Sequence, residues 1–391
     1  MKDLSNQLMS LPASATMAVS NKAAALKAAG RDVIALAGGD PNFLTPNHII
    51  EAAYAAIKGG ATNYAAPSKG TKASVDAIAA KYERDTGVSV NPGSQIIVTP
   101  GGKWGINLAL GAIVNPGDEV MVLEPVWVSY VPLIQLQGGI PVGVSLPSER
   151  NFEITREQLD AHVSPKTKAI MVNSPCNPTG RVITQAEVDV LVSFAVDNDL
   201  YVIWDELYEH LIFDGGKHLP LGGLPGMAER TITINGLSKA YAMTGWRLGW
   251  MVGPEPVMKL AAKLHSQTIT CATTYGMDAI VAALNGPHDV VMEMRDSYCA
   301  RRDFMVAALN AIDGVECRSI EGAFYLFPRF TKTERNSAEL ATALLEQAEV
   351  AGTPGIAFGA AGEGHLRFSI ATAMEDLKRA ADRMARVIPN L

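Results

Sequence analysis

The stretch Asn235-Gly-Leu-Ser-Lys-Ala-Tyr-Ala-Met-Thr-Gly-Trp-Arg-Leu-Gly-Trp250 places Lys239 and Arg247 between two short apolar segments. These segments, Thr231–Ile234 before the lysine and Leu248–Val252 after the arginine, have the composition of buried strands. An amine and a fixed cation are therefore expected at neighbouring strand ends. An amine can form a Schiff base with an aldehyde, and a guanidinium can hold a phosphate through two parallel hydrogen bonds. The pair predicts a ligand that carries both groups.

The region around this stretch, from about residue 95 to 252, alternates short apolar segments with helical patterns. Such alternation is typical of a mostly parallel α/β sheet. The expected strands are Gln95–Thr99, Val120–Leu123, Lys168–Asn173, Leu200–Trp204, Thr231–Ile234 and Leu248–Val252. The expected helices are Asn47–Lys58, Lys72–Tyr82, Trp104–Val114 and Gln185–Asp197.

The pattern changes near residue 290, where long helical stretches enclose short strands. The helical stretches are Asp289–Ile312, Ser337–Ala351 and Met374–Val387, and the strands are Ala323–Phe327 and His365–Ile370. A chain of 391 residues is long enough for two domains. We expect a large domain of residues 46–288, a small α+β domain of residues 289–391, and an N-terminal segment, residues 1–45, that packs with the small domain.

The residues that follow the expected strands form a candidate site, because ligands of open α/β sheets bind at the carboxyl ends of the strands. Gly101 and Gly102 precede a helix, so their free backbone N–H groups could hold a phosphate. Trp127 could stack on a flat ring. Asn177, in an Asn-Pro-Thr-Gly turn, could donate to a phenolate oxygen.

Asp205 and Tyr208 follow the next expected strand. A buried acid needs a partner, and a protonated pyridine nitrogen is one. Tyr208 could donate to the same phenolate oxygen as Asn177. Each residue also has a common structural explanation, such as a glycine turn, a core tryptophan or a helix-capping aspartate. Together with Lys239 they favour pyridoxal 5'-phosphate (PLP), which has the aldehyde, phosphate, pyridine nitrogen and phenolate oxygen that these residues match.

The chain also resembles a known family, the class I aminotransferases, which are PLP enzymes of fold type I, and most closely their bacterial aspartate aminotransferase branch. The likeness covers nearly the whole chain. Its motifs are Pro-Ala-Ser-Ala-Thr (12–16), Gly-Asp-Pro-Asn-Phe (39–43), Asn-Tyr (63–64), Asn-Ser-Pro-Cys-Asn-Pro-Thr-Gly (173–180), Ser-Lys-Ala-Tyr-Ala-Met-Thr-Gly-Trp-Arg (238–247), Glu-Gly-Ala-Phe-Tyr (321–325) and Arg-Phe-Ser (367–369). The resemblance implies a large domain with a seven-stranded, mostly parallel sheet and a smaller α+β domain.

The resemblance also implies roles for the residues that contact PLP. Lys239 would hold PLP covalently and move the substrate proton. Asp205 would pair with the pyridine nitrogen, while Asn177 and Tyr208 would donate to the phenolate oxygen. Trp127 would stack on the ring. The implied phosphate site consists of Gly101, Gly102, Ser238 and Arg247.

Further implied roles concern the substrate and a second subunit. Arg367 would bind the substrate α-carboxylate, with Gly39, Trp127 and Asn177 nearby. Tyr64 matches a tyrosine that reaches the phosphate of the neighbouring subunit's cofactor, so a homodimer with shared active sites is expected. The expected partners are amino acid and 2-oxo acid substrates.

The amino donor depends on Lys103, at the position where this branch presents a lysine to the distal carboxylate. A cation there favours aspartate and glutamate, with 2-oxoglutarate as acceptor. The adjacent Trp104 and the lack of a lysine before Ser14 favour a broader or aromatic donor, and the lack of an evident arginine in 266–276 leaves the identity of the substrate open. Gly236 also stands where many members have a serine of the phosphate site. A C–S lyase or a decarboxylase remains an alternative, since PLP stabilises any α-carbanion.

Composition excludes several other classes of protein. The net charge is −7 without a basic tract, so nucleic acid is not an expected partner. The four cysteines lack CxxC spacing, which disfavours a metal site or disulfides and indicates a cytoplasmic protein. No apolar run approaches the roughly 20 residues of a membrane span. A nicotinamide dehydrogenase would need G-x-G-x-x-G, which 101–103 does not match, and a ligand-sensing regulator would need an added DNA-binding domain.

Overall fold

The centre of the protein is a seven-stranded sheet with the order β2-β8-β7-β6-β5-β3-β4, seen in a computed structural model that describes residues 3–11 and 15–391. All neighbouring pairs are parallel except those that β8 makes with β2 and β7. The expected α/β fold with a mostly parallel seven-stranded sheet is therefore confirmed. The strands are β2 (Ile96–Thr99), β3 (Glu119–Glu124), β4 (Ile140–Ser145), β5 (Thr167–Asn173), β6 (Tyr201–Asp205), β7 (Thr231–Gly236) and β8 (Gly249–Val252).

The strand β4 was not among the segments expected from the sequence. It contains Pro141 and Gly143, which weaken a strand signal, and most of its residues are at least partly exposed. It lies at the edge of the sheet and pairs with β3. An edge position tolerates proline because one side of the strand has no ladder partner.

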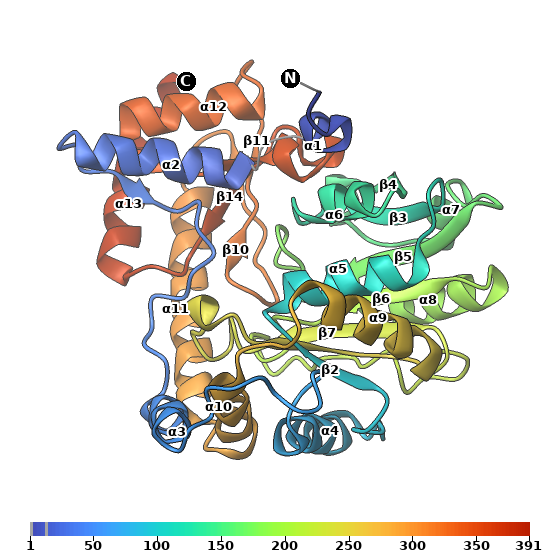
Figure 1. Cartoon of the computed structure of the whole chain (residues 1–391). Helices are drawn as coiled ribbons and strands as arrows, with labels where there is room; N and C mark the ends of the chain where they lie inside the picture. The colour runs from blue at the N-terminus through green and yellow to red at the C-terminus, as the bar shows by residue number, and fades with distance from the viewer. Residues whose placement is uncertain (1–2, 12–14) are drawn as a thin grey trace.

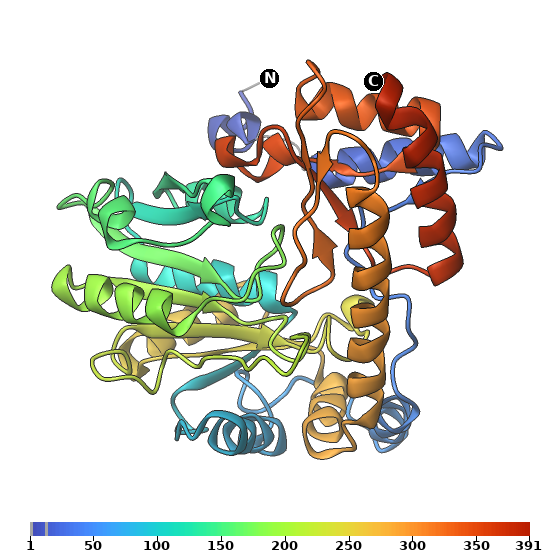
Figure 2. The same ribbon diagram turned by 180° about the vertical axis from the view of Figure 1, so that it is seen from behind.

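Helices cover both faces of the sheet (Figures 1 and 2). The helices α5 (Gly102–Ile113), α6 (Tyr130–Leu136) and α9 (Glu255–Thr268) pack on one face, and α7 (Arg156–Asp160) and α8 (Gln185–Asp197) pack on the other. Side chains of a strand alternate between faces. In β5, Ala169 and Met171 accordingly join the first layer, whereas Ile170 and Val172 join the second.

A third group of helices packs beside β2 and β8. It consists of α3 (Asn47–Lys58), α4 (Lys72–Thr86) and α10 (Thr274–Asn285). The strand residues that share a core with these helices are Ile96, Val98, Trp250 and Val252. These residues alternate with Ile97 and Met251, which pack in the layer of α5 and α9, so the third group covers the opposite face of the sheet at β2 and β8.

The long helix α11 (Asp289–Asn310) runs from this third group toward the C-terminal elements (Figures 1 and 2). Its 22 residues span about 33 Å, so it connects the two parts of the molecule.

The C-terminal elements form a smaller α+β layer above the sheet in Figure 1. Its three-stranded sheet has the order β10-β14-β13, and the N-terminal β1 (Ile34–Ala35) pairs in parallel with β12 (Val350–Ala351). The N-terminal helix α2 (Ala15–Ala28) packs in the same layer. The other elements are α1 (Asn6–Ser10), β9 (Val315–Glu316), β10 (Tyr325–Leu326), β11 (Arg329–Phe330), α12 (Ser337–Ala343), β13 (Thr353–Pro354), β14 (Leu366–Ser369) and α13 (Met374–Val387).

The prediction of a single helix over Ser337–Ala351 was wrong for the second half of that range. The helix α12 ends at Ala343 and continues as one wider π turn, Leu344–Ala348. Glu349 then adopts a left-handed conformation, with φ of 55°, which ends the helix and allows Val350–Ala351 to pair with β1. Residues 12–14 of the Pro-Ala-Ser-Ala-Thr motif lie outside the described residues. None of the described helices is long and apolar enough to cross a membrane.

Candidate active site

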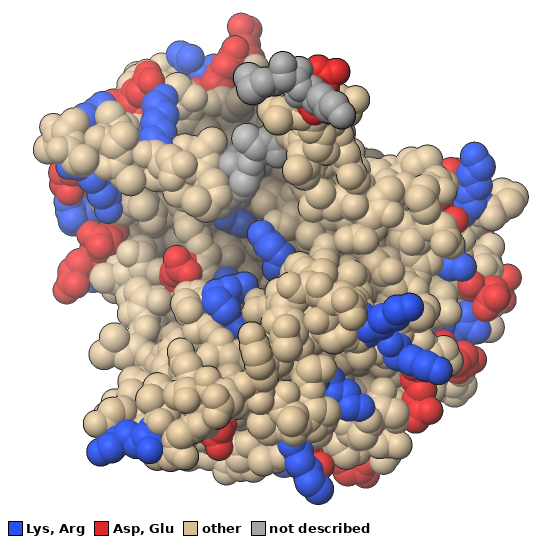
Figure 3. Space-filling model, in the orientation of Figure 1, with Lys and Arg blue, Asp and Glu red and all other residues tan. Residues whose placement is uncertain are grey.

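The carboxyl ends of β5 and β6 and the turn after β7 meet the C-terminal layer at a cavity of about 200 Å³. The face in Figure 3 is hollowed between these two parts, and Lys and Arg side chains lie in the hollow. The cavity brings together many of the residues that the sequence singled out. Its lining includes Gly39, Lys103, Trp127, Asn177, Asp205, Tyr208, Lys239 and Arg367, together with Met17, Val128, Ser129, Asn173, Leu207 and Tyr325.

Lys239 lies in the turn after β7, and its Nζ donates a hydrogen bond to the carbonyl oxygen of Gly39 at 2.8 Å. Among the described residues, no carboxylate lies within ion-pair distance of this amine. A side chain at position 39 would place its Cβ 2.5 Å from the hydroxyl of Tyr325 and 3.6 Å from Nζ of Lys239. Glycine at this position therefore leaves the amine room to reach a ligand.

Asp205 ends β6 and is buried. Its Oδ2 accepts a hydrogen bond from the hydroxyl of Tyr130 at 2.7 Å, and its Oδ1 accepts one from the backbone N–H of Leu207 at 3.2 Å. Burial raises the pKa of Asp205 to about 6, although both hydrogen bonds act to lower it. Within the described part of the chain no cation forms an ion pair with it, so a protonated ring nitrogen would complete the site.

Arg367, on β14, is buried with a relative exposure of 2%. Its Nη1 donates to Oδ1 of Asn177 at 2.8 Å, and its Nη2 donates to the carbonyl oxygen of Ala37 at 2.6 Å. The guanidinium lies 4.4 Å from the ring centroid of Tyr325. Because Arg367 occupies the amide oxygen of Asn177, the Nδ2 group of that amide is left as a donor for a ligand.

The charge of Arg367 has no counter-ion among residues 3–11 and 15–391. Its Nε is buried without a hydrogen-bond partner, and burial lowers the pKa of its guanidinium. Arginine stays protonated in proteins, so this is a desolvated cation. The geometry suits a carboxylate, which can accept two parallel hydrogen bonds from a guanidinium.

Tyr208 and Tyr325 meet in the wall of the cavity, with their hydroxyl oxygens 3.1 Å apart. Burial, followed by the nearby Tyr325, raises the pKa of Tyr208 well above its usual value. The hydroxyl of Tyr208 therefore stays protonated and can donate to an anionic oxygen. Tyr325 belongs to the motif 321–325 but had no role predicted from the sequence, and Tyr130, three residues after Trp127, was not predicted at all.

The expected phosphate site lies at the start of α5. Gly101 has φ of 85° and precedes Gly102, the first residue of the helix. A Cβ at position 101 would lie 2.5 Å from Nη2 of Arg247, so the guanidinium packs directly on the glycine. No carboxylate of the described chain pairs with Arg247, and the buried Ser238 lies nearby in sequence. A helix N-terminus and an unpaired guanidinium together can bind a dianion.

The backbone explains why glycine stands at position 236. A Cβ there would lie 2.8 Å from the carbonyl oxygen of Leu248 and 2.9 Å from Cα of Gly249, on the neighbouring strand. A side chain at this position would therefore force β7 and β8 apart. Phosphate contacts from this turn must come from other groups, such as the Ser238 hydroxyl.

Lys103 lines the cavity, whereas the predicted phosphate-site residues and Tyr64 do not. Nζ of Lys103 lies 5.1 Å from the ring centroid of Trp127. Burial, with a smaller contribution from Arg247, lowers the pKa of Lys103. Tyr64, between α3 and α4, is 78% exposed and does not line the cavity of its own chain.

The unpaired groups of the cavity fit PLP with an amino acid substrate. Within the described part of the chain, the amine of Lys239 and the guanidinium of Arg247 at the start of α5 have no anionic partner, and Asp205 has no cation. Arg367 also has no anionic partner among the described residues, and a substrate carboxylate would provide one. A ligand with a pyridine nitrogen, a phosphate and an attached amino acid would satisfy all four positions.

Comparison with known proteins agrees with this geometry. Residues 31–384 match the family described as Aminotransferase class I and II. The chain is 42% identical to the aspartate aminotransferase of Pyrococcus abyssi, covering 92% of each chain. It is 39% identical to aromatic-amino-acid aminotransferase 2 of Thermococcus litoralis, covering 91% of this chain and 92% of that one. The solved aspartate aminotransferase from Thermus thermophilus with maleate has a TM-score of 0.94 and 40% identity, covering 99% of this chain and 100% of that one.

The chain therefore belongs to the class I and II aminotransferases, a family that uses PLP. It is an aminotransferase, as the resemblance implied. Its relatives include both aspartate and aromatic aminotransferases at similar identity, so the comparisons leave the amino donor open.

Proposed function

We propose that the protein transfers the amino group of aspartate to 2-oxoglutarate, forming glutamate, with PLP bound at Lys239. The observation that carries the choice of substrate is Lys103. Its ammonium lies at the cavity, above the ring of Trp127, and no acid among the described residues pairs with it. A partly desolvated cation beside the bound substrate favours one with a second carboxylate.

The proposed reaction assigns a role to each group of the cavity. When bound, PLP supplies an aldehyde that takes up the substrate amino group and a ring that withdraws electrons from the substrate α-carbon. Asp205, as a carboxylate, would hold a proton on the ring nitrogen. Lys239 would hold the cofactor and, once freed, move the proton from the substrate α-carbon. Asn177 and Tyr208 would each donate a hydrogen bond to the phenolate oxygen.

Arg367 would orient the substrate through its α-carboxylate. Its guanidinium is fixed by Asn177, by the carbonyl oxygen of Ala37 and by the ring of Tyr325. A carboxylate bound there holds the α-carbon in one place relative to Nζ of Lys239. Fixed positioning of this kind contributes much of the catalysis in enzymes. Gly101, Gly102, Ser238 and Arg247 would hold the phosphate at the other end.

The substrate assignment can be tested at Lys103. Lys103→Ala should raise KM for aspartate by roughly 10- to 100-fold, since a hydrogen bond to a charged group is worth about 1.5–3 kcal/mol. KM for alanine and phenylalanine should change little. Steady-state kinetics with the three donors measures this, and Lys72→Ala is a matched control because Lys72 is an exposed lysine at the start of α4. Equal effects on the three donors would reject the acidic donor.

An aromatic donor is the second candidate. Met17 and Val128 line the cavity next to Trp127 and provide apolar surface for a ring. A relative named as an aromatic-amino-acid aminotransferase supports the same interpretation. In that case Lys103→Ala would leave phenylalanine as the preferred donor and aspartate as a poor one in both proteins. A C–S lyase or a decarboxylase would instead release its product without any 2-oxo acid acceptor.

We also propose a homodimer with shared sites. Several large apolar side chains on and around α3 are exposed, with relative exposures of 40% for Ile50, 56% for Tyr54, 42% for Ile57, 78% for Tyr64 and 89% for Leu44. Such a patch on one face marks an interaction surface. A second copy of the chain would cover it and would place Tyr64 beside the partner's phosphate site.

A subunit-mixing experiment tests the shared site. Lys239→Ala and Tyr64→Ala homodimers should each have little activity. Unfolding and refolding an equal mixture should restore roughly a quarter of wild-type activity, because half of the dimers are hybrids with one intact site. Refolded Lys239→Ala alone is the control. A mixture no more active than its components, or an active monomer in sedimentation, would contradict the proposal.

Two further features remain proposals. We propose the division into residues 1–45, 46–288 and 289–391, which is supported by the pairing of β1 with β12 and by the packing of α2 in the C-terminal layer. We also propose a cytoplasmic location. The four cysteines, all within the described residues, are unpaired, which suits a reducing compartment.

A further inference from the structure

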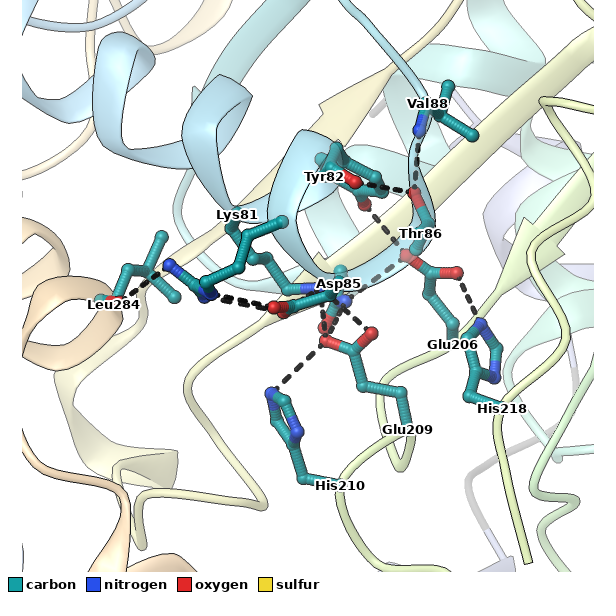
Figure 4. A network of polar contacts seen from close by, with 12 residues as sticks. Lys81, Tyr82, Asp85, Thr86, Val88, Glu206, Glu209, His210, His218 and Leu284 are labelled. Carbon is teal, nitrogen blue, oxygen red and sulfur yellow. Dashed lines mark hydrogen bonds and ion pairs between the residues drawn. The ribbon is translucent and has the colours of Figure 1, made fainter.

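The residue after Asp205, Glu206, does not line the cavity but points into a buried cluster of polar groups (Figure 4). Its Oε1 accepts hydrogen bonds from the hydroxyl of Tyr82 at 2.7 Å and from Nδ2 of Asn235 at 3.2 Å. Its Oε2 lies 2.7 Å from Nε2 of His218. The cluster thus joins α4, the end of β6, the end of β7 and the segment around residue 218.

A second carboxylate in the cluster, Glu209, is neutralised by a lysine. Lys81 has no exposed surface, and its Nζ lies 2.9 Å from Glu209. Burial alone would raise the pKa of Glu209, but Lys81 lowers it to about 2. Asn235 donates to both Glu206 and Glu209. Both carboxylates therefore have the donors that an ionised state requires.

The charges of the cluster balance if His218 carries a proton. Lys81 offsets Glu209, and the more exposed Asp85 has a partner in Arg84 at 2.7 Å. Glu206 is then left with His218 as its cation. Burial acts to lower the pKa of His218, but Glu206 outweighs it and the pKa is raised. A buried carboxylate without a cation is costly, so the protonated imidazole stabilises the cluster.

The remaining ionisable groups around the pair do not supply this charge. Burial lowers the pKa of His210, which favours its neutral form, and burial raises the pKa of Tyr82 well above its usual value. Nδ1 of His218 is buried and has no hydrogen-bond partner. This holds whether the imidazole is neutral or protonated, so the atom does not indicate which form is present. The ionisable groups that act on Glu206 or His218 are Lys81, Tyr82, Asp205 and Glu209, and Asp85 and His210 act on Lys81 and Glu209.

We propose that Glu206 and His218 act as a pair of positioning residues that set the pH range over which Asp205 is ionised and can hold the ring nitrogen of PLP. The inference rests on the proposed function of Asp205. Burial is the largest cause of the raised pKa of Asp205, and the negative charge of Glu206, the next residue in the chain, adds a smaller rise. A proton on His218 offsets that charge. Changing either member of the pair therefore changes the proton affinity of Asp205, and the two changes have opposite signs.

Electrostatics determines the direction in which each variant shifts the proton affinity of Asp205. His218→Gln removes the positive charge, so the unopposed Glu206 makes Asp205 bind its proton at higher pH. Glu206→Gln removes the negative charge, so Asp205 stays ionised to lower pH. Because PLP binding requires ionised Asp205, the acid-side midpoint of PLP affinity should move up for His218→Gln and down for Glu206→Gln, each by about one pH unit or less.

The experiment measures PLP affinity of the apoenzyme by equilibrium dialysis across pH. His218→Lys, which restores a positive charge with a different shape, should return the midpoint toward that of wild type. His162→Gln, a change at a histidine two residues after α7, is the matched control and should not move the midpoint. A purely structural role would weaken binding in both variants without moving the midpoints in opposite directions. If Glu206→Gln does not fold, the comparison of His218→Gln with His218→Lys carries the test.

Asp205→Asn separates the two proposals. Its affinity should be low and should lack the acid-side transition. If wild type and Asp205→Asn show the same transition, the role of Asp205 fails and the inference fails with it. If the transition depends on Asp205 but His218→Gln leaves its midpoint unchanged, or if both variants move it in one direction, the pair alone is rejected.

Discussion

Lys239→Ala is expected to abolish amino transfer, with a fall in kcat of at least about 10⁴-fold, because one side chain both holds the cofactor and moves the substrate proton. The variant should still bind PLP, since Asp205, Arg247 and the start of α5 are unchanged. Borohydride should no longer fix the cofactor to the protein, and this can be read by mass spectrometry.

A primary amine in solution provides the control for Lys239→Ala. Methylamine can replace the missing Nζ as a base and should restore a small part of the activity. It should have no effect on wild type. Near wild-type turnover of Lys239→Ala without added amine would place the reacting lysine elsewhere in the chain.

The second large effect is expected at Asp205, where the apoenzyme and the PLP-bound enzyme should respond in opposite ways. The pKa of Asp205 is raised by burial to about 6, above the value near 3.9 of an unfolded chain. The folded apoenzyme therefore resists ionisation. Below about pH 4, Asp205 is protonated in both states and does not lower the free energy of unfolding. As the pH rises through about 6, this free energy falls, and the fall is then complete.

Asp205→Asn should accordingly stabilise the apoenzyme at pH 8 by on the order of 2–3 kcal/mol relative to wild type, and by little at pH 4. The same change should weaken PLP binding, because the ring nitrogen loses its ion-pair partner, a loss of about 3–5 kcal/mol for a buried pair. Urea unfolding and dialysis measure the two effects, and Asp205→Glu should keep more activity. Wild-type kcat in Asp205→Asn would mean that Asp205 only caps the following turn.

The sequence predicted most elements that have strong local signals. The expected bounds of α8 agree with the structure because Thr184 and Glu187 form a reciprocal capping box at its start. The strand β4 was missed because its proline and glycine are typical of a loop, although an edge position tolerates them. The extension of α12 was wrong because pairing of Val350–Ala351 with β1, which is remote in sequence, overrides the helical pattern.

Some residues of the candidate site could likewise be predicted from the sequence, and others could not. Asp205 ends a strand, and Asn177 and Lys239 come shortly after strands, so their meeting at one edge of the sheet could be predicted from the sequence. The contact of Tyr130 with Asp205 depends on how α6 packs, which no local pattern reveals.

The charge cluster behind the site was not predicted at all. Lys81 and Glu209 are 128 positions apart, and each alone has the pattern of an ordinary charged residue of a helix or loop. The pairing of the two side chains follows from tertiary packing of α4 against the end of β6. Tertiary contacts of this kind set the charge around Asp205 and lie beyond the reach of sequence patterns.

The measurement that tests the central claim most directly is a half-reaction with single amino acids. The PLP-loaded enzyme is mixed with each of the common amino acids in turn, without an acceptor, and the visible absorbance of the lysine-bound cofactor is followed. We expect rapid loss of the band with aspartate and glutamate, formation of the matching 2-oxo acid, and recovery of the band on addition of 2-oxoglutarate. Loss of the band with aromatic amino acids but not with aspartate or glutamate would contradict the proposed substrate, and no loss with any amino acid would contradict amino transfer at this site.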